Sequence, residues 1–245
     1  MATSMAAIAA LKHEGLGTDK ASFVAGHSLG EYSALCAAGV FSLADTARLL
    51  RVRGRAMQAA VPVGVGAMAA VLGLDAEAAE RVAADAAQDE VCQLANENDP
   101  SQNVLSGNKA AIDRAIALAK DAGAKRALPL PVSAPFHCAL MQPAADEMAQ
   151  ALADVTMHAP DVPLVANVRA KAVSDADVIR DLLIEQVTGR VRWRSSVEWM
   201  AAQGVTEFWE IGAGKALSGM IRRIAKEATC RAISTPDDIA KVKAG

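Results

Sequence analysis

Short apolar runs alternate along the chain with longer stretches in which apolar residues recur every three or four positions. The short runs fit β-strands and the longer stretches fit amphipathic helices, so the alternation is typical of an α/β protein. Before residue 62 the pattern predicts a helix over 1–14, a buried strand over 22–25, a helix over 31–38 and a helix from 42 to about 58.

The order of predicted strands and helices changes between residues 62 and 131. After the Pro- and Gly-containing stretch VPVGVG, the pattern predicts a strand, a helix, two strands, a helix and a strand, over 67–74, 75–88, 91–98, 102–107, 109–123 and 124–132. This βαββαβ order is that of ferredoxin-like domains. We therefore expect a ferredoxin-like small domain over 62–131, inserted between the two parts of a larger core, 1–61 and 132–245.

After the inserted domain, short predicted strands again alternate with predicted helices. The pattern predicts helices over 138–154, 175–187, 194–203 and 214–228, and strands near 162–168 and over 206–212. Strands that alternate with helices favour a parallel sheet covered by those helices. The expected fold class is thus α/β, with a parallel sheet in the larger core.

Composition excludes several classes of protein. The chain of 245 residues is 52% hydrophobic, which is enough for a large core. A net charge of −3 and an aromatic content of 3% argue against a nucleic-acid-binding protein. The two long uncharged stretches are interrupted by Pro and Gly, and the N-terminal residues lack a signal-peptide pattern, so we expect a soluble, cytoplasmic protein without membrane contact.

The cysteines do not form a recognisable site. Cys36, Cys92, Cys138 and Cys230 are scattered without a CxxC pair. This arrangement indicates free thiols in a reducing compartment, and it predicts neither a disulfide framework nor a bound metal.

One short motif indicates a catalytic residue. Gly26-His27-Ser28-Leu29-Gly30 fits G-x-S-x-G and lies between a predicted strand and a predicted helix. In the nucleophile turn of α/β-hydrolases this context projects the serine hydroxyl from the sheet, and the next residue offers its N–H to an oxyanion. The motif therefore predicts that Ser28 is a nucleophile in an α/β-hydrolase-like core; the alternative is a glycine-rich turn with an idle serine.

A serine nucleophile needs a base, and the chain has four histidines. His13 lies near a helix end and His158 in a loop, whereas His27 lies in the turn itself and should point away from Ser28. His137 follows a Pro-punctuated strand exit, where sites of α/β folds assemble. His137 is thus the candidate base, with a structural histidine as the alternative. No carboxylate is evident as the third member of a catalytic triad, and a main-chain carbonyl can hold the imidazole tautomer instead.

The helix over 42–58 carries several arginines. Its apolar repeat predicts an inner face made of Ala47, Leu50, Gly54 and Met57. Arg48 and Arg55 lie well outside this face and should be solvated. Arg51 and Arg53 flank the face on opposite sides, so periodicity leaves both open as binding residues, and a surface salt bridge is the alternative for either.

Several blocks resemble one known family in the same order along the chain. They are GHSLGEYSAL, RVRGRAMQAAVPVGVGAMAAVLGL, NENDPSQNVLSG, GAKRALPLPVSAPFHCALMQPAA and SVEWMAAQGVTEFWEIGAGKALSGM. Together they resemble the malonyl-CoA:acyl carrier protein transacylases of bacterial fatty acid biosynthesis, which are akin to polyketide synthase acyltransferase domains. The resemblance implies a ping-pong transfer of malonyl from malonyl-CoA to the phosphopantetheine thiol of acyl carrier protein, by a monomer without a cofactor of its own.

The resemblance also implies roles for single residues. Ser28 matches the serine that becomes malonylated, and His137 matches its general base and acid. Leu29 would supply an oxyanion N–H, and Gln186 falls where the family's backbone carbonyl orients the histidine.

Three further residues match positions that contact the substrate. Arg53, rather than Arg51, matches the arginine that pairs with the malonyl carboxylate. Phe136, directly before the histidine, matches the pattern that goes with malonyl rather than methylmalonyl. Asn98 falls in the loop near the pantetheine arm. For the acidic carrier protein, basic residues gather at Arg190, Arg192 and Arg194 and at Arg222, Arg223 and Lys226.

The sequence departs from the family in one respect. Family members begin several dozen residues earlier, with a core strand and a Gly-Gln-Gly-x-Gln loop that donates a second N–H to the oxyanion. We therefore expect a chain of reduced activity, because losing one oxyanion donor costs about 10²–10³ in kcat. Two alternatives remain: a serine esterase or thioesterase of the α/β-hydrolase type, and an inactive remnant that binds carrier protein.

Overall fold

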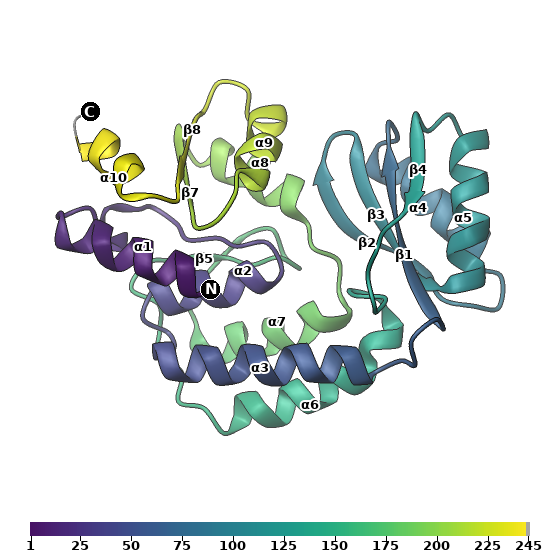
Figure 1. Ribbon diagram of the computed structural model, residues 1–245, viewed down its shortest axis with the longest axis horizontal. Coiled ribbons are helices and arrows are strands. Elements are labelled where there is room, and N and C mark those ends of the chain that lie inside the picture. Colours follow the sequence, from purple (N-terminus) through teal and green to yellow (C-terminus); the bar gives the residue numbers. More distant parts are fainter. Residues whose placement is uncertain (244–245) are drawn as a thin grey trace. The chain divides into compact units, whose positions relative to one another are not determined.

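The computed structural model describes residues 1–243 and divides into two units (Figure 1). The first unit consists of Met1–Arg48, Thr156–Ile179 and the chain from Ser195 onward, and the second of Leu49–Val155 and Arg180–Arg194. The chain passes between the units at four points. Three lie within helices, α3 (Leu43–Ala59), α7 (Ala176–Thr188) and α8 (Trp193–Ala202), and the fourth lies between Val155 and Thr156, outside any helix or strand. Among residues 1–243, no helix combines the length and the apolar character that a membrane span needs.

The first unit combines helices with short strands. Its elements are α1 (Ala2–His13), η1 (Thr18–Lys20), α2 (Leu29–Ala37), β5 (Leu164–Val165), β6 (Ala172–Val173), β7 (Glu207–Ile211), α9 (Ala216–Ile224), β8 (Thr229–Ile233) and α10 (Pro236–Lys243). Strand β7 pairs with β8 in parallel, and β5 pairs with β6 in antiparallel. The mixture of parallel pairing and helices agrees with the α/β class.

The buried strand predicted over 22–25 is wrong. Ser22 is exposed and the next three residues are half-buried. Only Val24 forms a bridge: its N–H donates to Pro163 O at 3.0 Å, and its carbonyl accepts from Val165 N–H at 2.8 Å. The segment pairs at this single point because the chain turns immediately afterwards, at Gly26.

The second unit contains the elements predicted between 62 and 131. They are β1 (Gly66–Leu72), α4 (Ala76–Ala87), β2 (Cys92–Asp99), β3 (Gln102–Asn108), α5 (Lys109–Asp121) and β4 (Arg126–Pro129). The strands form one sheet in the order β2-β3-β1-β4, and all neighbouring strands are antiparallel. The element order that the hydrophobic pattern predicted is therefore confirmed.

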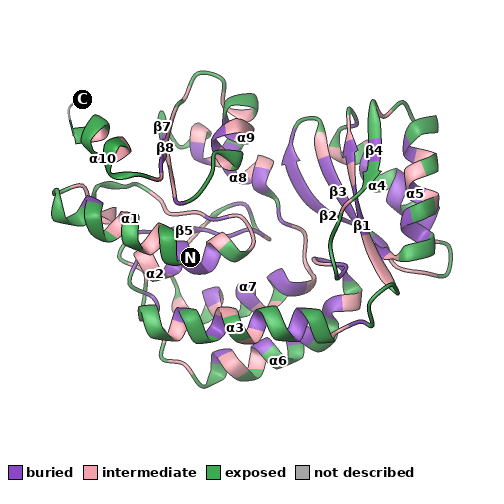
Figure 2. Ribbon diagram, viewed as in Figure 1, coloured by how far each residue is buried: buried purple, intermediate pink, exposed green. Residues whose placement is uncertain are grey.

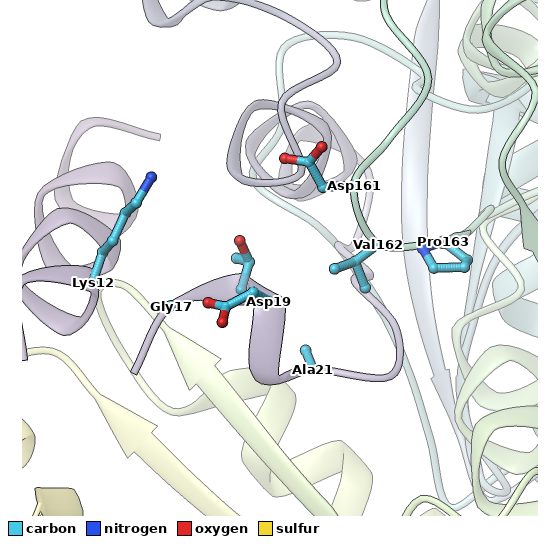
Figure 3. Close-up of a pocket in the computed structure, with 8 residues that line it drawn as sticks. Lys12, Gly17, Asp19, Ala21, Asp161, Val162 and Pro163 are labelled. Carbon is cyan, nitrogen blue, oxygen red and sulfur yellow. The ribbon is translucent and has the colours of Figure 1, made fainter. Parts of the chain in front are cut away.

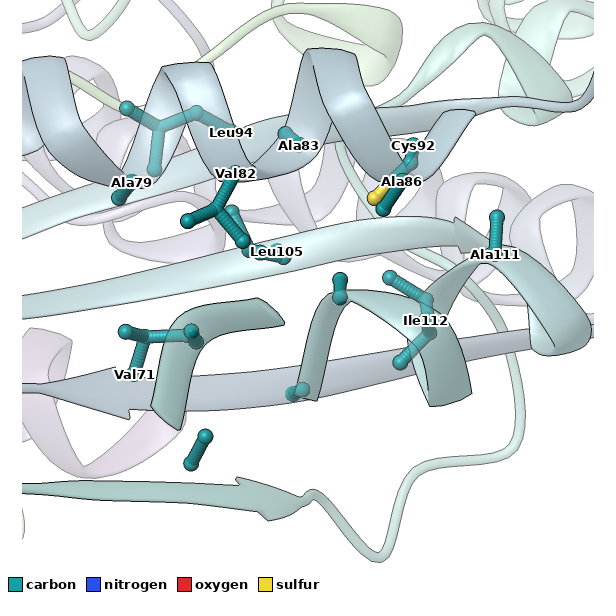
Figure 4. Packing of buried hydrophobic residues seen from close by; sticks show 14 of the residues in the cluster. Val71, Ala79, Val82, Ala83, Ala86, Cys92, Leu94, Leu105, Ala111 and Ile112 are labelled. Atoms are coloured by element: carbon teal, nitrogen blue, oxygen red, sulfur yellow. The ribbon is translucent and has the colours of Figure 1, made fainter. Parts of the chain in front are cut away.

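The two faces of this sheet pack against different partners. On one face, Val71, Leu94 and Leu105 pack against α4 and α5, whose facing residues are mostly alanines (Figure 4). These small side chains let the helices lie close to the strands, and α5 buries the side that faces the sheet (Figure 2). On the other face a smaller cluster of Met68, Ala95 and Val104 receives Leu130 and Phe136.

Of the four residues predicted for the inner face of α3, Met57 is buried as expected and the other three lie one position beyond a buried residue. Ala47 and Gly54 are exposed, and Leu50 is only half-buried. The buried residues are Thr46, Leu49, Arg53, Ala56 and Met57. This set keeps the helical spacing but starts one residue earlier, because a threonine and an arginine occupy buried positions that an apolar pattern does not recognise.

The helix predicted over 138–154 begins later than expected. A 3₁₀ turn, η2 (Ala139–Met141), comes first, and α6 (Gln142–Ala153) follows with a proline in its first turn. A proline fits there because the first helical N–H groups have no partner within the helix.

Candidate active site

Ser28 lies in a strained turn at the start of α2. Its backbone has φ 51° and ψ −108°, a conformation that costs a non-glycine residue of order 1–3 kcal/mol. The turn is so tight that a Cβ on Gly26 would lie 2.0 Å from the Gly30 carbonyl oxygen, whereas a Cβ on Gly30 would meet nothing within 4 Å. The first glycine of G-x-S-x-G is therefore required by packing.

Asn167 holds this turn from the next segment of the same unit. Ser28 N–H donates to Asn167 Oδ1 at 2.7 Å, and Asn167 Nδ2 donates to Gly26 O at 2.7 Å. The Asn167 backbone N–H in turn donates to Glu31 Oε1 at 3.0 Å. Both side chains are buried, with 2% of Asn167 and 1% of Glu31 exposed.

The Leu29 N–H begins helix α2 and makes no hydrogen bond within residues 1–243. The N-terminal N–H groups of a helix point outward and favour negative charge. The Leu29 N–H therefore has the chemistry of an oxyanion donor, whereas the Ser28 N–H is already bonded to Asn167.

His137 lies in the second unit and also has a left-handed backbone, with φ 60°. Its imidazole is 4% exposed, and Nδ1 lies 2.8 Å from the Gln186 carbonyl oxygen. Because a carbonyl can only accept, Nδ1 carries the proton, and in the neutral imidazole Nε2 is then the acceptor. Among residues 1–243, four non-glycine residues have positive φ, and Ser28 and His137 are two of them.

Gln186 connects His137 to Arg53. Its backbone carbonyl accepts from the imidazole, and its side-chain Oε1 accepts from Arg53 Nη2 at 2.9 Å. Gln186 is fully buried and Arg53 is 6% exposed, whereas Arg51 on the same helix is exposed. The Gln186 amide is neutral, so this contact orients the guanidinium without neutralising it. The structure thus brings together three of the residues that the sequence analysis selected.

The remaining candidates of the second unit lie on or against its sheet. Asn98 is a buried residue of β2. Phe136 is half-buried against the cluster around Met68. Ser28 and Leu29 belong to the first unit.

The buried cysteines are poor nucleophiles. Burial raises the pKa of the Cys92 thiol to about 11 and also raises the pKa of the Cys138 thiol, which follows His137 directly. The Cys138 thiol lies 3.1 Å from the Pro135 carbonyl oxygen, to which it donates. At neutral pH both thiols stay protonated, so neither competes with a serine for an acyl group.

A pocket of about 410 Å³ lies elsewhere in the first unit (Figure 3). It is lined by Lys12, Gly17, Thr18, Asp19, Ala21, Asp161, Val162 and Pro163. None of the candidate residues lines this pocket, so it is separate from the candidate site.

The two basic clusters differ in their partners. Arg190 pairs with Glu80 at 2.6 Å, and Arg194 pairs with the buried Glu97 at 2.5 Å. The other cluster, Arg222, Arg223 and Lys226, is exposed at the end of α9 and just beyond it. Arg190 and Arg194 therefore stabilise their own unit, whereas Arg192 and the second cluster are exposed to solvent.

The acyl transferase domain family matches this chain over residues 1–235. The match covers the serine turn of the first unit and the His137, Gln186 and Arg53 group of the second. The chain therefore belongs to the acyltransferase class.

Relatives and solved structures are more specific. The malonyl CoA–acyl carrier protein transacylase of Escherichia coli K12 is 52% identical over 217 residues, which cover 89% of this chain and 70% of the relative. The solved acyl-carrier-protein S-malonyltransferase of Bartonella henselae is 53% identical with a TM-score of 0.96, over 100% of this chain and 79% of that one. The chain belongs to the malonyl CoA–acyl carrier protein transacylase family, and the resemblance that its sequence blocks predicted is confirmed.

A further solved structure includes a partner. It is the complex of a type II PKS acyl carrier protein with its malonyl-transacylase. This chain is 43% identical to the matched chain of that structure, with a TM-score of 0.95, over 99% of this chain and 78% of the matched one.

Proposed function

We propose that this chain transfers the malonyl group of malonyl-CoA to the phosphopantetheine thiol of holo acyl carrier protein, in fatty acid biosynthesis. The observation that carries the proposal is the pair of contacts made by Gln186. One residue orients an imidazole through its carbonyl and a buried guanidinium through its side chain. An acyl transfer base and a carboxylate-binding group are then held together, which is what a malonyl thioester requires.

In the first half-reaction His137 Nε2 takes the proton of the Ser28 hydroxyl, and Ser28 Oγ attacks the thioester carbonyl carbon. The oxyanion is stabilised by the Leu29 N–H at the start of α2. The C–S bond then breaks, and the CoA thiolate leaves with the proton that His137 carries. Ser28 is left as a malonyl ester.

The second half-reaction reverses these steps. The carrier's phosphopantetheine thiol gives its proton to His137 and attacks the malonyl ester, and Ser28 leaves with that proton. The reaction uses no cofactor held by the chain itself, because the phosphopantetheine arrives on the carrier protein. The Gln186 carbonyl keeps the imidazole in the same tautomer throughout.

Arg53 selects the substrate in this proposal. A guanidinium binds a carboxylate through two parallel hydrogen bonds, and burial strengthens such a pair. Phe136 would exclude a methyl group on the α-carbon, and Asn98 would lie near the pantetheine arm. An ordinary esterase has no use for a buried arginine that is oriented in this way.

The finer description of the fold is also proposed. The strand order β2-β3-β1-β4 and the βαββαβ connectivity support a ferredoxin-like small domain over 62–131. The parallel β7–β8 pair and the strained serine turn support an α/β-hydrolase-like core built from 1–61 and 132–245.

The acidic carrier protein needs a basic surface. Arg190 and Arg194 already hold Glu80 and Glu97. All three residues of the other cluster, Arg222, Arg223 and Lys226, are exposed. This exposure makes that cluster the better docking candidate, because charges that face solvent can steer an oppositely charged partner.

The intact mass of the protein after exposure to malonyl-CoA tests the proposed function. We expect the mass to rise by one malonyl group on Ser28, and to return to its starting value when holo acyl carrier protein is added and becomes malonylated. Release of CoA without an adduct and without malonylated carrier would instead indicate an esterase or thioesterase. No reaction with either substrate would indicate an inactive carrier-binding protein.

Arg53→Met should weaken the preference for malonyl over acetyl. The variant loses two charged hydrogen bonds to the substrate carboxylate, each worth about 1.5–3 kcal/mol, so the KM for malonyl-CoA should rise by at least about 100-fold. Acetyl-CoA lacks this carboxylate, and its slow transfer should change little. Rates of acyl transfer from the two CoA esters at several concentrations measure the effect.

Arg51→Met is the matched control, because it removes the same charge from an exposed position of the same helix. The KM for malonyl-CoA should stay at the wild-type value in this variant. Equal effects of the two substitutions would mean that general electrostatics, rather than a specific ion pair, governs the affinity for malonyl-CoA.

A further inference from the structure

We propose that Asn167 is a positioning residue for the nucleophile, and that Glu31 holds Asn167 in place. This inference rests on the proposed function, since it concerns how Ser28 is prepared to accept an acyl group. The sequence motif identifies the serine turn alone, and Asn167 lies 139 residues beyond Ser28.

The carboxamide of Asn167 bridges the two sides of the turn. Its Oδ1 accepts from Ser28 N–H and its Nδ2 donates to Gly26 O, both at 2.7 Å. A backbone N–H can only donate and a carbonyl can only accept, so these two contacts fix which end of the amide is oxygen. A side chain that only accepts or only donates satisfies one side of the turn and leaves the other unpaired.

The bridge acts on the strained part of the backbone. The φ of 51° at Ser28 is unfavourable for any residue other than glycine, and it persists only where the surroundings enforce it. Without the bridge the turn can relax toward an ordinary conformation, which rotates the hydroxyl away from its reactive direction. A shift of about 1 Å in a reacting group can slow a reaction by about 10²-fold.

The bridge also decides which N–H groups are available to an oxyanion. Asn167 occupies the Ser28 N–H, and the neighbouring Leu29 N–H makes no hydrogen bond within residues 1–243. Relaxation of the turn would therefore disturb the oxyanion donor together with the nucleophile.

Glu31 anchors the bridge from helix α2. Its Oε1 accepts from the Asn167 backbone N–H at 3.0 Å, and only 1% of Glu31 is exposed. Helix α2, which begins directly after Ser28, thus holds Asn167 in place through Glu31. Ser28, Asn167 and Glu31 are therefore linked by hydrogen bonds within the first unit.

Two substitutions test the proposal. Asn167→Ala removes both contacts, and we expect malonylation of Ser28 at saturating malonyl-CoA to slow by about 10²-fold with an unchanged KM. Asn167→Asp keeps the volume of the side chain and the acceptor but loses the donor to Gly26 O, and we expect a loss of at least about 10-fold. If the alanine variant does not fold, the isosteric aspartate variant decides.

Asn103→Ala is the matched control. Asn103 is also a fully buried carboxamide that donates to a backbone carbonyl, that of Leu74, at 2.9 Å. We expect its thermal stability to fall by an amount similar to that of the Asn167 variants, with no change in the rate of acylation. A purely structural Asn167 would behave in the same way, so acylation by folded Asn167 variants at the wild-type rate, or a change confined to KM, would overturn the proposal.

A second probe separates this proposal from the proposed function. A fluorophosphonate labels an activated serine without malonyl recognition, so its rate of reaction with Ser28 should fall in the Asn167 variants in parallel with malonylation. If the wild type is labelled by the fluorophosphonate but not by malonyl-CoA, the proposed function fails, and the labelling rates of the variants still decide the role of Asn167.

Discussion

Replacing Ser28 with alanine should abolish the malonyl adduct and all transfer to acyl carrier protein. The proposed mechanism has no other route, because the acyl group must leave CoA before the carrier protein binds. Loss of a serine nucleophile in serine hydrolases costs on the order of 10⁶-fold in kcat. The buried thiols of Cys92 and Cys138 offer no substitute, because burial raises the pKa of both.

Intact mass after incubation with malonyl-CoA, and carrier malonylation over time, measure the effect. Ser22→Ala is the matched control, since Ser22 is an exposed serine six residues earlier in the chain; it should form the adduct at the wild-type rate. An adduct of unchanged yield in the Ser28 variant would remove this residue from the mechanism.

Local patterns were sufficient for the four-stranded sheet and its two helices. Strand alternation and helical periodicity are properties of neighbouring residues, and the segments between 66 and 129 show both clearly. The same reasoning missed β8 and α10, because the stretch RRIAKEATCRAI continues the amphipathic pattern of α9 beyond Ile224, where the helix ends. Strand β8 pairs with β7 along its whole length, and this pairing depends on contacts that a local pattern does not contain.

The candidate site was predictable where one residue type has few alternatives. The G-x-S-x-G motif identifies Ser28 as the candidate nucleophile, and the chain has only four histidines as candidates for its base. Arg53 was different, since periodicity allowed Arg51 equally and the resemblance alone selected Arg53. Periodicity could not select Arg53 because the pattern assigns charged residues to the solvent-facing side of a helix, whereas Arg53 is buried on the inner face of α3.

Asn167 could not be predicted from sequence. Its partners, Gly26, Ser28 and Glu31, are more than a hundred residues away, and an asparagine after a short apolar run is common. Glu31 left a weaker signal, as a carboxylate within the small-residue helix that follows the serine. Contacts of this kind exist only once the chain is folded, so only coordinates reveal them.

His137→Asn should slow both half-reactions while leaving the local structure in place. The φ of 60° at this position is tolerated better by asparagine than by alanine, and the asparagine amide can still donate to the Gln186 carbonyl as Nδ1–H does. What the variant lacks is the lone pair of Nε2, so the Ser28 hydroxyl loses the proton acceptor that the proposed mechanism assigns to it. General acid–base catalysis contributes about 10²–10⁴-fold, which is the expected loss in the rate of malonyl-enzyme formation.

Rapid-mixing measurements of adduct formation, and of its discharge to the carrier thiol, should show equal losses, because the same imidazole serves both steps in the proposed mechanism. His158→Asn, a substitution of an exposed loop histidine, should leave both rates unchanged. A variant at position 137 that slows discharge but forms the adduct at the wild-type rate would mean that another group activates Ser28, and that His137 acts only on the carrier thiol.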